Sequence, residues 1–252
     1  MKLIIGVGGR KNSGKDMVCS IFNYINYKTP EQASYHNWEL NRQQYDITLK
    51  NRVIHFADPV KDNLSVMFGI NRKLFDDRYY KDEIWYDIRR GIFLEQKKFT
   101  LNNIKLVIDD FTNLDSFRKL IADNSEMPVI KLRTLMQVYA TLMRTCFDDD
   151  IWVNSIIAKA ELISQGRELC LIGDVRYINE AMAIRSVRKS STGVVVRVSR
   201  NIANINVDNH QSEEDLFDAD YTIDNNSTII DTFYQCFNIY KELSEKFNRK
   251  RK

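Results

Sequence analysis

The sequence predicts an α/β protein in which a parallel sheet lies between two layers of helices. Short apolar runs at residues 3–7, 53–57, 169–173, 194–198 and 221–223 are typical of buried strands. Segments in which apolar residues recur at helical spacing separate most of these runs. Strands that alternate with helices in this way form a parallel sheet covered on both faces.

The predicted helices each have a signal of their own. Asp58-Pro59 begins a helix, with Asp as the N-cap and Pro at the first helical position, and Gly69 ends it. Further helices are expected at about 150–164, at about 177–189 and from about residue 227. Apolar stripes mark two more, one after the glycine-rich turn and one from about residue 130: Val18, Ile21, Phe22 and Ile25 in the first, and Leu132, Leu135, Met136, Tyr139 and Met143 in the second.

The chain is expected to fold as a single domain over residues 1–252, with an insertion at about 70–125. The insertion has patchy apolar content and no bounding linker, and a hairpin turning near Asn102-Asn103 is expected within residues 93–108. Its aromatic and charged residues suit either an acceptor-binding lobe or a dimer contact, and the sequence leaves both open. Residues 246–252 form a basic tail with five cations and no acid.

The charge balance and the cysteines argue against several classes of protein. The formal charge is +3, but without the basic tail the chain carries 32 basic and 34 acidic residues, so nucleic-acid binding is not expected. The four cysteines are isolated, which argues against a disulfide framework or structural zinc. No apolar run reaches the roughly 18 residues that cross a bilayer. No signal peptide is recognised, so we expect a cytoplasmic location and no membrane partner.

The sharpest motif lies between the first strand and the first helix. Residues 9–16 read Gly-Arg-Lys-Asn-Ser-Gly-Lys-Asp and match the phosphate-loop pattern G-x-x-x-x-G-K, except that Asp16 replaces the usual Ser or Thr. The glycines let backbone N–H groups surround the β- and γ-phosphates, and the next helix directs its positive end at them. Lys15 adds a mobile cation that follows the charge of a transferring γ-phosphoryl group. The motif therefore predicts a three-layer fold of the P-loop kinase type.

Asp16 makes the metal site the least regular part of this prediction. In most P-loop enzymes the hydroxyl at this position binds Mg²⁺. A carboxylate can hold the ion directly or through water, although it also repels the phosphates, and Met17 offers no hard oxygen. Asp174 follows the strand at residues 169–173 and so lies at a carboxyl end, where open α/β sheets bind ligands. Asp16 and Asp174 are the candidate ligands of an Mg²⁺ ion that accompanies ATP.

These residues, with others downstream, resemble the bacteriophage deoxynucleoside monophosphate kinase family. The order and approximate spacing of its motifs are preserved over most of the chain, and only about 70–125 matches poorly. The resemblance implies a small P-loop kinase that uses ATP and Mg²⁺, often as a homodimer, in the host cytoplasm if it is virus-encoded. It is carried by Met1–Ile4, the phosphate loop, Ala57–Asp62, Arg133 with Leu135–Gln137, Trp152-Val153, Asp174–Arg176 with Glu180, and His210–Glu213.

The resemblance also implies two sets of binding residues and a catalytic group of Lys15, Asp174 and Arg176. The ATP set is Asn12, Ser13, Gly14, Lys15, Asp16, Met17 and Arg200. The set for the deoxynucleoside monophosphate is Lys11, Val60, Lys61, Arg133, Gln137, Trp152, Asp174, Arg176 and Glu180.

Residue chemistry supports several of these roles, each against a plainer alternative. Lys61 lies in the first turn of a helix, where an acceptor phosphate would be favoured, or it is a surface lysine. Arg133, Gln137 and Arg144 share a helix face suited to a phosphate and a base edge, or they form a solvated polar face. Trp152 either stacks on the nucleobase or belongs to the core.

The second half of the chain supplies the remaining candidates. Asp174 can also accept a hydrogen bond from the acceptor sugar. Arg176 and Glu180, four residues apart at a helix start, suit a pair that positions the acceptor, or an ordinary cap with a surface ion pair. Arg197 and Arg200 flank a strand end and could approach the ATP phosphates. The loop that follows, with His210, Ser212 and Glu213, suits a lid that excludes water.

The predicted activity is the ATP-dependent conversion of deoxynucleoside 5'-monophosphates to diphosphates, which serves DNA precursor supply. One alternative is a P-loop kinase for another small acceptor. The other is a nucleotide-gated binding protein that transfers nothing. The acceptor-side cluster of Lys61, Arg133, Gln137 and Arg176 argues against the second alternative, because a switch needs no second phosphate site.

Overall fold

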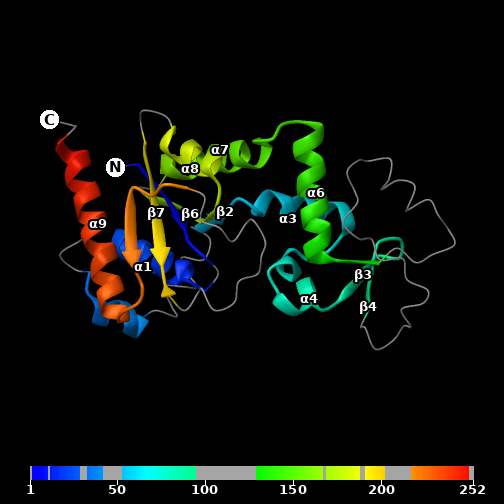
Figure 1. Cartoon of the computed structure of the whole chain (residues 1–252), viewed down its shortest axis with the longest axis horizontal. Helices are drawn as coiled ribbons and strands as arrows, with labels where there is room; N and C mark the ends of the chain where they lie inside the picture. Colours follow the sequence, from blue (N-terminus) through cyan, green and yellow to red (C-terminus); the bar gives the residue numbers. More distant parts are fainter. Residues whose placement is uncertain are drawn as a thin grey trace. The chain divides into compact units, whose positions relative to one another are not determined.

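The computed structural model describes residues 2–10, 12–28, 33–41, 53–94, 129–166, 169–187, 191–201 and 217–249. The chain divides into two compact units (Figure 1). Unit 1 comprises Met1–Phe56 and Val153–Lys252, and unit 2 comprises Ala57–Trp152. None of the helices in the described ranges is long and apolar enough to cross a membrane.

The described part of unit 1 contains a five-stranded sheet in the order β2-β6-β1-β7-β8, and every neighbouring pair is parallel. This confirms the predicted α/β class. The strands occupy the five predicted apolar runs, with small differences at their ends: β1 (Leu3–Gly8), β2 (Val53–His55), β6 (Leu169–Val175), β7 (Thr192–Ser199) and β8 (Tyr221–Asp224).

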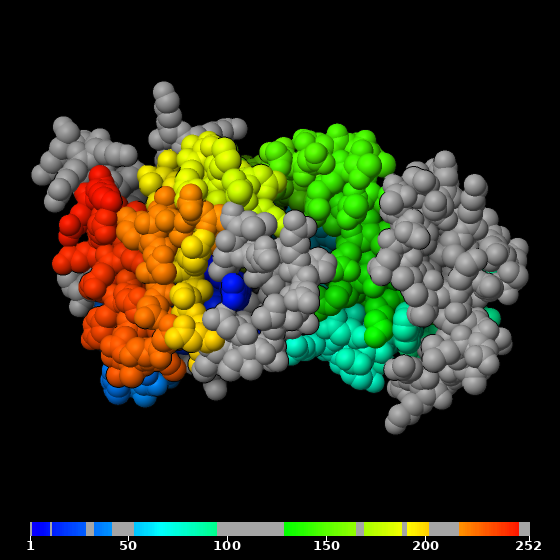
Figure 2. Space-filling model, in the orientation of Figure 1, coloured from blue at the N-terminus to red at the C-terminus, as the bar shows by residue number. Residues whose placement is uncertain are grey.

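Helices cover both faces of this sheet, because successive strand residues face opposite sides. Leu3, Ile5 and Val7 pack in one cluster with α1 (Lys15–Tyr27) and α9 (Ile229–Arg249). Ile4 packs in another with α7 (Ile151–Gly166) and α8 (Ile178–Arg185). In the space-filling view, α9, β8 and β7 form one continuous surface (Figure 2).

The carboxyl end of β6 holds one residue more than its partner strand. The pairing of β1 with β6 runs from Val7 opposite Gly173 directly to Gly8 opposite Val175, so Asp174 is the extra residue. Asp174 has a left-handed backbone, with φ of 64°. Ile172 and Val175 both belong to the core cluster under α8, three residues apart rather than two. The bulge therefore places Val175, rather than residue 174, in the apolar layer under α8.

Unit 2 combines helices with a small antiparallel sheet in the order β4-β3-β5. Its core contains side chains from α3, α6 and the sheet, among them Leu64, Tyr86, Ile130 and Leu135. The elements are α3 (Asp58–Phe68), η2 (Arg72–Phe75), α4 (Arg78–Asp82), β3 (Trp85–Asp87), β4 (Ile92–Leu94), β5 (Val129–Lys131) and α6 (Leu132–Cys146).

One local prediction was wrong. The residue at the N-cap of α3 is Ala57, and Asp58 is the first helical residue. The strand at Ile92–Leu94 pairs with β3. Its turn is closed by Asp87, whose carboxylate accepts from the N–H groups of Arg89 and Arg90 at 3.0 Å. The Asn102-Asn103 turn itself lies outside the described residues, as do most of the insertion at 70–125 and the last three residues of the basic tail.

Candidate functional site

The phosphate loop joins β1 to α1 in a conformation that most residues disfavour. Gly9, Asn12 and Gly14 have φ values of 142°, 64° and 99°. Gly14 is the N-cap of α1, and a Cβ added there would lie 2.4 Å from the side-chain nitrogen of Asn225. Glycine is required at this position by both its backbone angle and the space available.

The Lys15 ammonium lies against the loop it belongs to. Its Nζ donates hydrogen bonds to the carbonyl oxygens of Gly9, at 2.7 Å, and Arg10, at 2.8 Å. The lysine thus holds the first turn of the loop closed while keeping a positive charge beside it. A phosphate at the N-terminus of α1 would meet both this charge and the helix dipole.

A buried amide supports the loop from the far end of the sequence. Asn225 lies just after β8, and its Nδ2 donates to the carbonyl of Ser13 at 2.7 Å. The hydroxyl of Thr232 donates to Asn225 Oδ1 at 2.9 Å, and Thr232 is fully buried. Sequence reasoning missed this pair, because an isolated Asn after a strand is more often a surface turn residue.

The other predicted ATP residues occupy different surroundings. Asn12 and Asp16 are exposed, and Met17 packs against the core cluster of α1 and α9. Ser13 is 1 % exposed, and its Oγ has no hydrogen-bond partner within the part of the chain described. Lys11, assigned to the acceptor, lies outside the described residues. An unsatisfied buried hydroxyl in a phosphate loop is a group that a ligand or its metal would satisfy.

Two carboxylates lie near this loop. Burial raises the pKa of the Cys19 thiol, the charges of Asp16 and Asp174 raise it further, and Lys15 lowers it. The charges of Asp16, Asp174 and Lys15 thus all act on one buried thiol in α1. Among the described residues no three His, Cys, Asp or Glu side chains cluster as a metal site. Two carboxylates with phosphate oxygens and water are nevertheless a donor set that Mg²⁺ accepts, so these residues fit the ion.

Glu180 holds the start of α8. It is 7 % exposed, and its carboxylate accepts from the backbone N–H groups of Arg176, at 2.7 Å, and Tyr177, at 3.1 Å. Burial raises the pKa of Glu180 to about 7, and the charge of Asp174 adds to the rise, whereas the two hydrogen bonds oppose it. Glu180 thus caps the start of α8, as the plainer of its two predicted roles requires. Asp174, Arg176 and Glu180 also lie together after β6, at one end of the sheet.

Arg197 in β7 lies over the ring of Phe217, with 5.0 Å from its guanidinium carbon to the ring centroid. Its terminal nitrogen donates to the Phe217 carbonyl, and its Nε is buried without a hydrogen-bond partner in the described ranges. A cavity of about 660 Å³ lies beside these two residues and follows one face of α8. Arg200 is exposed just beyond β7, and the proposed lid with His210, Ser212 and Glu213 lies outside the described residues.

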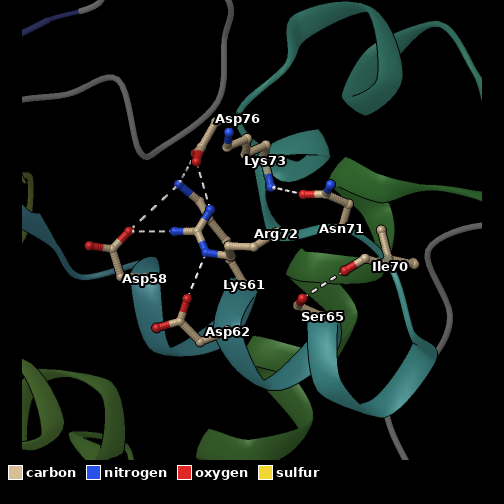
Figure 3. A network of polar contacts seen from close by, with 9 residues as sticks. All are labelled: Asp58, Lys61, Asp62, Ser65, Ile70, Asn71, Arg72, Lys73 and Asp76. Atoms are coloured by element: carbon tan, nitrogen blue, oxygen red, sulfur yellow. Dashed lines mark hydrogen bonds and ion pairs between the residues drawn. The ribbon is translucent and has the colours of Figure 1, made fainter. Parts of the chain in front are cut away.

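In unit 2, Lys61 belongs to an ionic network (Figure 3). Its Nζ lies 2.7 Å from Asp76 and 4.0 Å from Asp58, and its side chain is 14 % exposed. Arg72 pairs with Asp58, Asp62 and Asp76 at 2.9, 2.6 and 2.6 Å. Burial alone would raise the pKa of Asp76, but the hydrogen bonds from Lys61 and Arg72 lower it. Lys61 is therefore already neutralised by carboxylates.

The predicted acceptor residues of α6 do not behave alike. Arg133 forms a two-pronged pair with Asp82, with N–O distances of 2.6 and 2.9 Å. Gln137 and Arg144 are exposed. The helix therefore presents one guanidinium fixed in orientation and two exposed polar side chains.

Trp152 and Val60 occupy the core of unit 2. Trp152 is 6 % exposed, its ring N–H donates to the carbonyl of Ala140 at 3.1 Å, and it contacts the ring of Tyr139. Val60 is 4 % exposed. Trp152 thus follows the core alternative, because its indole satisfies its own donor within the protein and offers no open face to a nucleobase.

Comparisons with known proteins agree with this geometry. None of the curated proteins compared with the chain matches it. A family model described as deoxynucleotide monophosphate kinase matches residues 2–236, a range that includes the phosphate loop, the bulged Asp174 and Asn225. The chain therefore belongs to the deoxynucleotide monophosphate kinase family.

Proposed function

We propose that this kinase transfers the γ-phosphoryl group of ATP to a deoxynucleoside 5'-monophosphate and so supplies diphosphates for DNA precursors. The proposal rests on the phosphate loop, whose backbone angles depend on glycines and whose carbonyl groups accept hydrogen bonds from Lys15. The chain that contains this loop matches the kinase family over residues 2–236. In the reaction an oxygen of the acceptor phosphate forms a bond to the γ-phosphorus. The bond from that phosphorus to the β–γ bridging oxygen breaks, and ADP leaves.

Unit 1 supplies the donor side in this proposal. The N–H groups of the loop and the start of α1 bind the β- and γ-phosphates, and Lys15 shifts its hydrogen bonds from the loop carbonyls to the γ-phosphate oxygens. A phosphate monoester is already nucleophilic near neutral pH, so no strong general base is required. Catalysis then rests on alignment and on neutralisation of charge.

Asp16 and Asp174 are the residues that would hold Mg²⁺, with the buried Ser13 hydroxyl close to the same phosphates. When bound, the ion neutralises charge on the phosphate oxygens. Asp174 is preferred as the main ligand, because it lies at the carboxyl end of β6, where open α/β sheets bind ligands. Asp16, exposed in the first turn of α1, would act through water.

Each unit has its own residues proposed to bind the acceptor. Arg176 and Glu180 remain proposed acceptor ligands in unit 1, with Glu180 acting by holding the backbone of Arg176. Arg133 and Gln137 remain proposed ligands in unit 2, and Lys61 only if a substrate displaces Asp76 from it. A homodimer is also proposed, from the family resemblance alone, and its mass in solution by light scattering tests it.

A coupled assay of ADP formation with Mg²⁺ against dAMP, dGMP, dCMP, dTMP and their ribose counterparts tests the proposal. We expect turnover that requires a deoxynucleoside monophosphate, with the diphosphate recovered. Turnover with a different small acceptor alone would contradict the substrate. ATP binding without any phosphorylated product would favour a nucleotide-gated binding protein.

A further inference from the structure

Lys81 is a half-buried lysine of α4 that no predicted site includes. Within the described ranges its ammonium makes no hydrogen bond and no ion pair, although acids lie close by in the sequence at Asp76, Asp77 and Asp82. Lysines are rarely withdrawn from water without a counter-ion. Its surroundings therefore need an explanation.

The two acids whose charges act on Lys81 are already paired with other cations. One oxygen of Asp76 accepts from Lys61 and the other from Arg72. One oxygen of Asp82 accepts from Arg133 Nε and the other from its terminal nitrogen. Both oxygens of each carboxylate thus already accept hydrogen bonds from cations other than Lys81. Neither forms an ion pair with Lys81 among the described residues.

Two of those cations also act on Lys81. Burial lowers the pKa of Lys81, the charge of Arg133 lowers it next, and Lys61 adds to the effect, while Asp82 and Asp76 only partly oppose it. Lys81 lies in α4, which packs on α6, the helix of Arg133, and α6 in turn packs on α3, the helix of Lys61. An anion placed beside Lys81 would relieve both the desolvation and the repulsion, and it would do so most fully if it carried two charges.

We propose that Lys81 binds the 5'-phosphate of the acceptor nucleotide, with Arg133 contributing the second positive charge. The inference rests on the proposed function, since the phosphate loop of unit 1 takes the donor phosphates and leaves the acceptor phosphate to be bound elsewhere. Lys61 is a weaker choice for this role. It already forms ion pairs with Asp58 and Asp76, whereas Lys81 forms none among the described residues.

Kinetics of Lys81→Met test the inference against a matched control. Lys73→Met removes a lysine from the neighbouring η2 turn, where it is exposed. Losing a charge-assisted contact of about 1.5–3 kcal/mol corresponds to a rise of roughly 10- to 150-fold in KM for the deoxynucleoside monophosphate. KM for ATP should stay unchanged, Lys73→Met should match wild type, and Lys81→Arg should recover most of the affinity. An unchanged acceptor KM in Lys81→Met would overturn the inference.

A binding measurement on the unmodified chain separates this inference from the proposed function. Lysines are labelled with acetic anhydride at pH 7.5 and quantified by mass spectrometry, with dGMP, dAMP or inorganic phosphate and without ATP. Protection of Lys81 but not Lys73 by the nucleotides supports the inference. Protection without any acceptor phosphorylation would overturn the proposed function and leave an anion site. Equal labelling with and without all three anions, in an enzyme that turns over, would overturn the inference. Protection by inorganic phosphate alone would overturn the assignment to the acceptor.

Discussion

Asn225 donates its side-chain N–H to the carbonyl of Ser13 at 2.7 Å, and this bond joins residues 212 positions apart in the sequence. It ties the segment after β8 to the phosphate loop in a buried setting. The amide is itself held by Thr232. The shape of the loop therefore depends on the last part of the chain as well as on its own glycines.

Asn225→Asp is expected to weaken ATP binding, because a carboxylate cannot donate to the Ser13 carbonyl and would repel it. Leaving a buried carbonyl unsatisfied costs about 1–3 kcal/mol, so we expect ATP affinity to fall at least about fivefold. Isothermal titration with ATP measures the change. Asn37→Asp, at an exposed position, is the control. ATP affinity equal to wild type in Asn225→Asp would show that the bond does not shape the loop.

Lys15→Ala is expected to lower turnover by at least about a hundredfold while the sheet and its helices stay intact. Lys15 anchors to the carbonyls of Gly9 and Arg10 at the loop surface rather than to the core. Coupled-assay kinetics and circular dichroism measure the two effects. Lys159→Ala, on the exposed face of α7, should change neither. Near-wild-type turnover of Lys15→Ala would remove the loop from the mechanism.

Gly14→Ala and Gly69→Ala separate backbone strain from lack of space. Both glycines have a left-handed backbone, with φ of 99° and 64°. A Cβ at Gly69 would meet nothing within 4 Å, whereas one at Gly14 would lie 2.4 Å from Asn225 Nδ2. Gly69→Ala should cost only about 1 kcal/mol of unfolding free energy. Gly14→Ala should also abolish measurable ATP binding. Urea unfolding and titration with ATP compare the two, and equal behaviour would contradict the steric argument.

Glu180 is expected to make stability depend on pH. Its pKa in the folded chain is raised to about 7, so the folded state holds a proton that the unfolded state has already lost. Stability from this residue is complete below about pH 4.5, the pKa of the unfolded state, and is lost as pH rises toward and through 7. Glu180→Gln keeps an acceptor for the two backbone N–H groups and cannot ionise.

Urea unfolding of Glu180→Gln between pH 5 and 8 checks this. Wild type should lose stability across that range relative to the variant, by an amount on the order of 2–3 kcal/mol. Glu245→Gln, on the exposed face of α9, is the matched control and should follow wild type. Parallel curves for wild type and Glu180→Gln would contradict the raised pKa.

The sheet could be predicted because its signals are local. The apolar run at residues 3–7 and the stripe of Val18, Ile21, Phe22 and Ile25 each record burial within a few residues of sequence, and all of these residues are buried. The start of α3 was misplaced by one residue, since Asp-Pro is compatible with both positions. Strand β3 was missed because three residues carry too little periodicity to be recognised.

The site was less predictable because its geometry depends on distant partners. Lys61 looks like a free cation in the sequence, and its neutralisation depends on Asp76, which lies 15 residues away across a turn. The sequence is compatible with Trp152 either at a ligand or in the core, because its hydrogen-bond acceptor, the carbonyl of Ala140, lies 12 residues away. Asn225 has no local signal at all, because its partner lies near the opposite end of the chain.

The end of a buried strand has to fill the apolar core and, in a binding site, also to carry a polar side chain. The extra residue in β6 gives these two tasks to different residues. Val175 fills the place under α8 that position 174 would otherwise occupy, so the apolar layer is complete without any contribution from Asp174. The side chain at position 174 is therefore not needed to fill the apolar layer under α8. Loss of that single residue would restore regular pairing and remove the acid. At this strand end Asp174 supplies the acid and Val175 supplies the packing under α8.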